Sequence, residues 1–411
     1  VIDKVTSRLC ESHFSIIRHK DFRLLVGYSQ AADESRPLLG VPTPCVGRER
    51  ELSLLEASFA SCRDNSTAAV VLVNAPAGVG KSRLRHEFLR RVEAQNAEAL
   101  VMMGRGDPMS VGASYGLLAQ ALRRLFGIAD TESPAVRQQK IRARVAESVK
   151  SDQAQRVAEF LGEICGTEFP ESVQLRAARQ DPHVMNDQVS QAFVDFLTAQ
   201  CTKSQTVLLI LEDLHWGDAL TVRIVDVALR ELADQPLMVL ALARPEVEDL
   251  FPSLWSGRAR QDIRLGGLPK RACERLVQQV LGNKVAPAVL GRIVEQAAGN
   301  ALFLEELVRT VAEGTGDELP ETVLAILHAR LMRLAPDARR VLRTASVFGD
   351  TFWEGGVRKL LGREGTQMKL ADWLQIQVEA EIIELRKESR IPGEVEYRFR
   401  HGLVREAAYG M

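Results

Sequence analysis

The stretch AVVLVNAPAGVGKS, residues 69–82, decides the fold. A short apolar run ends in a loop of small residues, the loop ends in Lys81-Ser82, and a helical pattern follows over residues 83–89. Strand, loop and helix N-terminus in this order follow the phosphate-binding pattern G-x-x-x-x-G-K-[ST]. Small residues let backbone N–H groups surround phosphate oxygens, and the helix N-terminus adds partial positive charge. The stretch therefore predicts a phosphate cradle at the end of a strand.

The residues of this loop are the candidate nucleotide contacts. Lys81 supplies a full charge to the β- and γ-phosphates, and the Ser82 hydroxyl is a candidate Mg²⁺ ligand. The first position of the pattern is Ala75 rather than Gly, and Ala resists positive φ. The alternative, a Gly-containing turn before a helix, is disfavoured because strand, loop, Lys-Ser and helix coincide. The candidate contacts are Ala75, Pro76, Ala77, Gly78, Val79, Gly80, Lys81, Ser82 and Arg83.

The composition is typical of a globular protein with packed cores. The 411 residues suggest two to three domains, and 46% of them are hydrophobic and 26% charged. The net charge is -1 and aromatic residues make up 5%. We therefore expect no general attraction to nucleic acid or to an anionic membrane, and base-stacking platforms are disfavoured.

The cysteines and the chain ends bear on the cellular compartment. The six cysteines are scattered without a C-x-x-C pair, which argues against a disulfide framework or a zinc site. No apolar run is long enough to span a membrane and no signal peptide is visible, so we expect a cytoplasmic protein. The chain starts Val-Ile-Asp-Lys without an initiator Met, and we interpret it as a fragment of a longer protein.

A second informative stretch is TVLLILED, residues 206–213. Its continuous apolar run is typical of a strand buried on both faces of a parallel sheet. It ends in Glu212 and Asp213, at the edge where ligands bind in open α/β sheets, which is the Walker B position. One acid is expected to hold Mg²⁺ and the other to orient or deprotonate the attacking water. The usual order is reversed here, which leaves the two roles open; solvated charges at a strand end are the alternative.

A further buried run, LMVLALA at residues 237–243, ends in Arg244. A cation at the tip of the strand beside Walker B is placed to sense the γ-phosphate; the alternative is a surface Arg before the turn-forming Pro245. His215 is a candidate γ-phosphate sensor, a partner of Asp213, or a packing residue. For Trp216 we favour packing.

The expected fold class is α/β: a P-loop NTPase with a parallel sheet, followed by a helical lid and a winged-helix domain. Strands and helices alternate up to residue 264, helices dominate afterwards, and residues 394–401 alternate as a strand does. Residues 1–43, with a candidate hairpin arm at 21–28, are interpreted as the tail of a preceding domain plus a linker; an N-terminal extension of the next domain is the alternative. The predicted domains that follow are 44–264 (ATPase), 265–317 (lid) and 318–411 (winged helix).

In this order the motifs resemble the AAA-like, origin-recognition-like region of the signal-transduction ATPases with numerous domains (STAND). The resemblance is to the branch in large bacterial regulators, where this region follows a protein kinase or nucleotide cyclase and precedes helical repeats. The motifs are VGREREL (46–52), the phosphate loop, LEDLHW (211–216), ARPE (243–246), GNALFLEEL (299–307) and FRHGLV (399–404).

The resemblance implies roles for residues outside the loop. Val46 and Gly47 would lie against the adenine, and residues 299–301 would close over the base from the lid. His401 would touch the β-phosphate of bound ADP; capping of local structure is the alternative for this residue. Residues 1–40 faintly resemble the end of a nucleotide cyclase domain.

The implied function is a regulatory switch that binds ATP or ADP with Mg²⁺ and hydrolyses ATP slowly. Its implied partners are ATP and other domains of the same chain, with oligomerisation on activation and no membrane. A nucleotide-binding scaffold without turnover is one alternative, motivated by Ala75 and by the reversed acid order. A DNA-binding ATPase of the origin-recognition type is the other, which the net charge and the low aromatic content disfavour.

Overall fold

The computed structural model describes residues 14–18, 23–28, 38–39, 41, 43, 45–95, 99–107, 112–129, 131–201, 205–282, 285–313, 322–362, 370–386 and 389–411. Within the first forty residues, β1 (Phe14–Arg18) and β2 (Arg23–Tyr28) pair as an antiparallel hairpin that contains most of the expected arm. The other residues of the predicted N-terminal tail up to residue 37 lie outside the described residues, as does the chain between the predicted lid and the C-terminal region at 314–321.

The centre of the molecule is a five-stranded parallel sheet in the order β4-β5-β6-β3-β7. Its strands are β3 (Ala69–Asn74), β4 (Ala99–Arg105), β5 (Thr206–Glu212), β6 (Leu237–Ala243) and β7 (Arg260–Arg264). All residues of β5 and β6 are buried, as their continuous apolar runs predict. The α/β fold class and the parallel sheet are confirmed.

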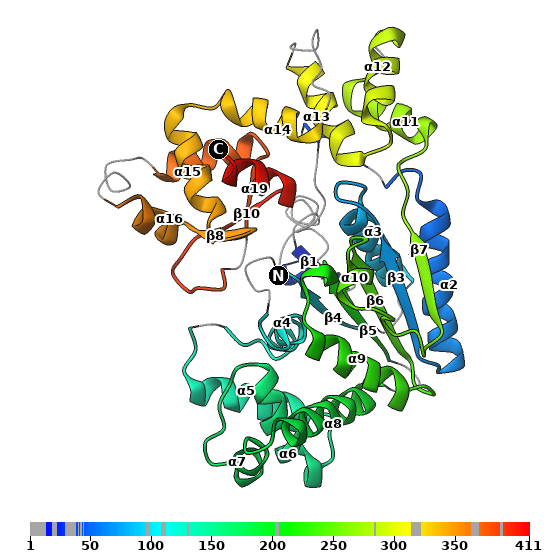
Figure 1. Cartoon of the computed structure of the whole chain (residues 1–411), viewed down its shortest axis with the longest axis vertical. Helices are drawn as coiled ribbons and strands as arrows, with labels where there is room; N and C mark the ends of the chain where they lie inside the picture. The colour runs from blue at the N-terminus through cyan, green and yellow to red at the C-terminus, as the bar shows by residue number, and fades with distance from the viewer. Residues whose placement is uncertain are drawn as a thin grey trace.

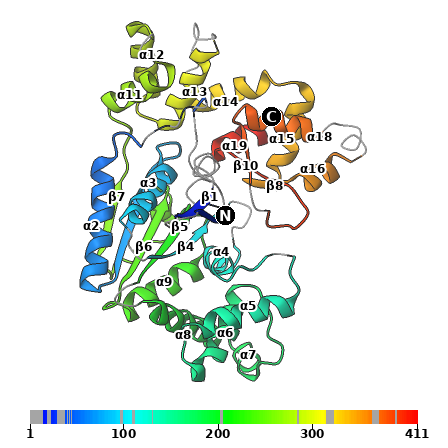
Figure 2. The same ribbon diagram turned by 180° about the vertical axis from the view of Figure 1, so that it is seen from behind.

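Helices cover both faces of this sheet (Figures 1 and 2). On one face α2 (Glu49–Asn65) and α3 (Lys81–Ala94) pack against Val71, Leu208 and Leu240. On the other, α4 (Gly116–Leu125) and α9 (Ala219–Glu231) pack against the alternate residues of the same strands. Successive side chains of a strand point to opposite faces, so each strand contributes to two cores.

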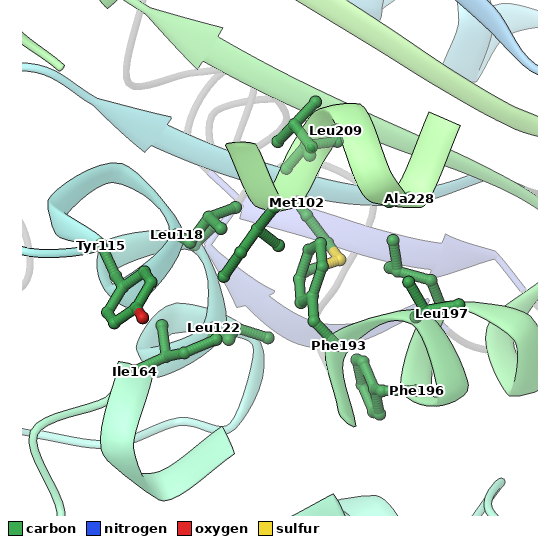
Figure 3. Close-up of a cluster of buried hydrophobic side chains, with 14 of the residues drawn as sticks. Met102, Tyr115, Leu118, Leu122, Ile164, Phe193, Phe196, Leu197, Leu209 and Ala228 are labelled. Atoms are coloured by element: carbon green, nitrogen blue, oxygen red, sulfur yellow. The ribbon is translucent and has the colours of Figure 1, made fainter. Parts of the chain in front are cut away.

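A helical insertion joins β4 to β5. It consists of α4, α5 (Pro134–Ala146), α6 (Ser151–Ile164), α7 (Val173–Ala178) and α8 (Pro182–Gln200). Figure 3 shows Phe193, Phe196 and Leu197 gathered near Met102 and Leu209. Asp181 caps α8 by accepting the N–H of His183, and Pro182 occupies the first turn, where a missing N–H costs nothing. This aromatic core fixes the insertion to the sheet.

After β6 the chain forms α10 (Val247–Leu250), β7 and then three helices. These are α11 (Lys270–Leu281), α12 (Pro287–Ala297) and α13 (Ala301–Ala312), which share a core that also buries Leu38. We call α11–α13 the lid. Figure 1 shows it at the end of the molecule opposite the helical insertion.

The remaining described residues, 322–362, 370–386 and 389–411, form a mainly helical region with its own core, which we call the C-terminal region. In chain order it contains α14 (Val323–Met332), α15 (Pro336–Ser346), β8 (Thr351–Trp353), α16 (Glu354–Leu361), α18 (Leu370–Glu379), β9 (Ile383–Leu385), β10 (Glu396–Phe399) and α19 (Gly402–Tyr409). The three strands form an antiparallel sheet in the order β8-β10-β9.

Buried ion pairs tie the lid to the C-terminal region. Arg309 of α13 pairs with Glu306 and with Glu381, and Glu306 also pairs with Arg330 of α14 at 2.8 Å. Glu306 and Arg309 are both buried. Charges taken out of water need partners of this kind, so the network orients the two parts relative to each other.

Candidate active site

The phosphate loop lies between β3 and α3, as predicted. Gly78 and Gly80 have φ of 80° and 107°, a left-handed backbone that favours glycine. Ala75 is not among the described residues with positive φ; its side chain is buried, and its N–H donates to the Ala243 carbonyl at 3.1 Å. The alanine at the first position of the pattern therefore introduces no backbone strain.

Lys81 begins α3 and bends back over its own loop. Its Nζ donates to the carbonyl oxygens of Ala75 at 2.7 Å and Pro76 at 3.0 Å. Burial lowers the pKa of Lys81 to about 8, against the opposing effect of the Asp213 carboxylate. Within the described part of the chain the Lys81 ammonium group is held by two carbonyls and has no direct carboxylate partner, so it can exchange the carbonyls for phosphate oxygens.

The two acids at the end of β5 point to different places. Glu212 is buried; it accepts a short hydrogen bond from the Ser82 hydroxyl, and its other oxygen lies 3.6 Å from Arg85 Nε. Hydroxyl and carboxylate oxygens side by side are the hard donors that Mg²⁺ prefers, with water and phosphate completing its shell. Ser82 and Glu212 therefore fit a Mg²⁺ ion.

Asp213 lies one residue further, with φ of 54°, and lines the cleft above the loop. Its Oδ2 is 3.1 Å from Arg105 Nε. Burial raises the pKa of Asp213, and the Arg105 guanidinium works against that rise. Because the backbone of Asp213 is left-handed, the chain turns here, and the carboxylates of Glu212 and Asp213 occupy different positions.

Arg105 ends β4 directly beside Glu212, its parallel partner in β5. Burial alone would lower the pKa of Arg105, but the carboxylates of Glu212, Asp213 and Asp350 outweigh it and raise the pKa above its ordinary value. The guanidinium is therefore charged. Arg105 belongs to none of the sequence motifs; its position at the end of a strand in a parallel sheet is the signal that points to it.

His215 is buried beside Trp216, a position that packing, one of its three predicted roles, requires. Its Nδ1 accepts the backbone N–H of Arg244 at 3.3 Å, and its ring lies 5.1 Å from the Trp216 ring, centroid to centroid. Burial and the charges of Arg244 and Lys81 lower the pKa of His215 to about 3, so the ring is neutral. Trp216, for which we favoured packing, also lines the cleft.

Arg244 and His401 reach the cleft from opposite sides. The Arg244 guanidinium lies 3.8 Å from Glu406 of the C-terminal region. His401 caps α19, because its Nδ1 accepts the N–H of Leu403 at 3.3 Å, and it lines the cleft as well. The capping alternative and a position at the nucleotide site are thus compatible.

The far end of the cleft is formed by residues 45–48 and the lid. Val46 packs against the lid core, and a Cβ on Gly47 would lie 2.7 Å from that of Ala272. Arg48, to which the sequence analysis gave no role, donates to the carbonyls of Val79 at 2.9 Å and Gly266 at 2.7 Å. It thereby joins the loop to the start of the lid.

The lid also bonds the phosphate loop itself. Asn300 caps α13 by accepting the N–H of Phe303, and its Nδ2 donates to the Ala77 carbonyl at 3.3 Å. The N–H of Leu302 donates to the Gly78 carbonyl at 3.0 Å. A Cβ on Gly78 would approach the Asn300 side chain to 2.7 Å, so the second requirement for glycine there is this close contact.

The predicted site residues therefore converge. Val46, residues 77–83, Asp213, Arg244 and His401 line one cleft between the sheet, the lid and the C-terminal region. Ala75, Pro76 and Glu212 contact residues of that cleft from below, and Gly47 lies beside Val46. Among the described residues no helix is both long and apolar enough to cross a bilayer.

Comparison with known proteins agrees with this architecture. Residues 44–240 match the AAA ATPase domain family. An uncharacterized protein of Rhizobium meliloti is 26% identical over 398 residues; the match covers 89% of this chain, but the chain spans only 35% of that protein's length.

The solved structures that resemble this one include the following two. The STAND protein with a tetratricopeptide repeat sensor from Pyrococcus horikoshii has a TM-score of 0.46 at 14% identity, over 89% of this chain and 43% of that one. The Aeropyrum pernix ORC1 protein, solved in complex with DNA, has a TM-score of 0.40 at 14% identity, over 91% and 95% of the two chains.

Proposed function

We propose, from the match of residues 44–240 to the AAA ATPase domain family, that the chain is a nucleotide-dependent regulatory switch that binds ATP with Mg²⁺ and hydrolyses it slowly. The single observation that carries the proposal is the cleft itself. One wall is the phosphate loop, and the other belongs to the C-terminal region, so a bound nucleotide would contact both. A ligand shifts a conformational equilibrium only through such differential contacts.

The charge of the cleft supports a polyphosphate ligand. Ten cationic side chains face six carboxylates along its walls. The cations are Arg48, Lys81, Arg83, Arg85, Arg105, Arg244, Arg309, Arg398, Arg400 and Arg405, and the acids are Asp213, Glu305, Glu306, Asp350, Glu381 and Glu406. The excess of positive charge lies in a partly buried site, where a nucleotide triphosphate would neutralise it.

We assign different roles to the two acids. Ser82 and Glu212 would hold the ion, and when bound Mg²⁺ neutralises charge that develops on the β- and γ-phosphate oxygens. Asp213 would orient the attacking water and accept its proton, and its raised pKa suits a base. Lys81 and Arg244 would bind the phosphates. The adenine would lie at Val46 and Gly47, and His401 would approach the β-phosphate.

The C-terminal region supports a switch better than a DNA-binding function. Its order of helix α15, strand β8, helices α16 and α18 and hairpin β9–β10 supports the predicted winged helix. Within that order α18 takes the place of the helix that reads DNA. It carries Asp372 and Glu379 and no Lys or Arg, so it would repel phosphates rather than bind them.

We also propose that the ATPase works within a longer chain and that its partners are other domains of that chain. The support is that the Rhizobium relative is nearly three times as long as the matched part. The predicted domain limits 44–264, 265–317 and 318–411 remain proposals of the same kind.

Two substitutions test the function. Lys81→Ala should weaken ATP and ADP binding by about two orders of magnitude, since a charge-assisted contact contributes about 1.5–3 kcal/mol. Asp213→Asn should leave binding in place and lower phosphate release by about 10²–10⁴-fold. Calorimetric titration measures the first and a phosphate-release assay the second, with the exposed Lys359→Ala and Asp249→Asn as matched controls.

The outcomes separate the alternatives. Unchanged ATP affinity in Lys81→Ala contradicts the site. Phosphate release by the unaltered protein that does not exceed that of Asp213→Asn leaves a binding scaffold without turnover.

A further inference from the structure

The guanidinium of Arg105 connects two parts of the molecule. Its Nε lies 3.1 Å from Asp213 Oδ2, and a terminal nitrogen lies 3.2 Å from Asp350 Oδ2. The other terminal nitrogen is buried and has no hydrogen-bond partner among the described residues. A buried donor of a charged group without an acceptor is costly, so this nitrogen requires an explanation.

The two carboxylates that bind Arg105 belong to different parts of the molecule. Asp213 follows β5 of the central sheet, whereas Asp350 precedes β8 in the C-terminal region. The Asp350 carbonyl accepts the N–H of Phe399 in β10 at 2.8 Å, which fixes Asp350 to the small antiparallel sheet. Any movement of the C-terminal region therefore carries Asp350 with it and leaves Arg105 on β4.

Arg105 also lines the cleft in which we place the nucleotide. Lys81, Asp213 and Arg244 line the same cleft. The side chain is only partly exposed, at 24%, so the interaction of its charge with a neighbouring anion is weakly screened. A terminal phosphate in this place would carry more charge than the single carboxylate of Asp350.

We propose that Arg105 binds the terminal phosphate of ATP in competition with Asp350, so that ATP, and not ADP, weakens the hold of the C-terminal region. This inference rests on the proposed function and adds to it the residue that distinguishes the two nucleotides. The Nε of Arg105 stays paired with Asp213, whereas its terminal nitrogens bind either Asp350 or the phosphate. Because coupling is reciprocal, the free energy by which ATP weakens the Arg105–Asp350 pair equals the free energy by which loss of the Asp350 charge strengthens ATP binding.

The test compares two nucleotides in four proteins. ADP and a non-hydrolysable ATP analogue with an imido β–γ bridge are titrated into the unaltered chain, Asp350→Asn, Arg105→Gln and the double variant. Asp350→Asn should tighten analogue binding by about fivefold or more, the lower range of allosteric coupling, and leave ADP within about twofold. Arg105→Gln should weaken the analogue selectively, and adding Asp350→Asn to it should change neither affinity.

Other results overturn the inference. If Asp350→Asn changes the affinities for both nucleotides equally, the cleft has loosened in general. If Asp350→Asn still changes the affinity for the analogue when Arg105→Gln is present, Arg105 is not the mediator. If Arg105→Gln does not fold, the selective effect of Asp350→Asn, an amide of the same shape, remains decisive. If the unaltered chain binds neither nucleotide, the proposed function is overturned as well. If it binds both and Asp350→Asn does not change the ratio of the two affinities, this inference alone is overturned.

Discussion

The two walls of the cleft are built in different ways. The wall of the phosphate loop is made from neighbours in sequence: Lys81 donates to carbonyls five and six residues before it. The opposite wall depends on partners far apart, and Arg105 and Asp350 are separated by 245 positions. The difference teaches that phosphate binding is encoded locally, whereas the response to a nucleotide depends on how separate parts of the chain are placed.

The largest expected effect on the local wall concerns the charge of Lys81. Its pKa is lowered to about 8 in the protein without ligand, and phosphates, which bind the ammonium form, would raise it again. Binding should therefore take up a proton above about pH 8, and ADP affinity should fall by up to about tenfold per pH unit there. Calorimetric titrations between pH 7.5 and 9.5, in buffers of different ionisation enthalpy, measure both.

Lys81→Arg provides the control, because arginine stays charged throughout this range. The variant should bind without proton uptake and with an affinity that does not depend on pH. A pH-independent affinity of the unaltered protein would contradict the assignment of the phosphate contact to Lys81.

An intermediate effect is expected at Asn300, where the lid bonds the local wall. Asn300→Ala removes the cap of α13 and the bond to the Ala77 carbonyl, and should lower the free energy of unfolding by about 1 kcal/mol. Ser133→Ala removes a cap of the same kind from α5, distant from the cleft. Both should lower the melting temperature, but only Asn300→Ala should weaken nucleotide binding. Equal nucleotide affinities in the two variants would show that the lid bond does not reach the ligand.

The smallest effect is expected at Ala75. Ala75→Gly restores the common pattern, yet the position needs no positive φ, so glycine adds freedom to the unfolded chain at a cost of about 0.4–1 kcal/mol. Loss of the buried methyl group adds to this cost. Chemical denaturation measures this loss, and nucleotide affinity and turnover should stay within twofold. A large gain in turnover would show that the alanine limits the local wall.

The sequence predicted the features that depend on residues close together in the chain. The loop at residues 75–82, the buried runs of β5 and β6 and the acids after β5 follow from patterns within a few residues. Strand β7 was not predicted, because RQDIR at an edge of the sheet buries only Ile263 and shows no apolar run. The different directions of Glu212 and Asp213 depend on the left-handed turn at Asp213 and on Ser82 across the sheet, which no linear pattern contains.

Helix α13, which Asn300 caps, can act as a rigid lever between the phosphate loop and the C-terminal region. Its twelve residues make a rod about 18 Å long, held at one end by the carbonyls of Ala77 and Gly78 and at the other by the pairing of Arg309 with Glu381. A tilt of about 5° at the loop would move the far end by about 1.5 Å, enough to break a hydrogen bond there. A small adjustment of the cradle around a phosphate would thus be magnified mechanically at a distance, without any new contact along the way.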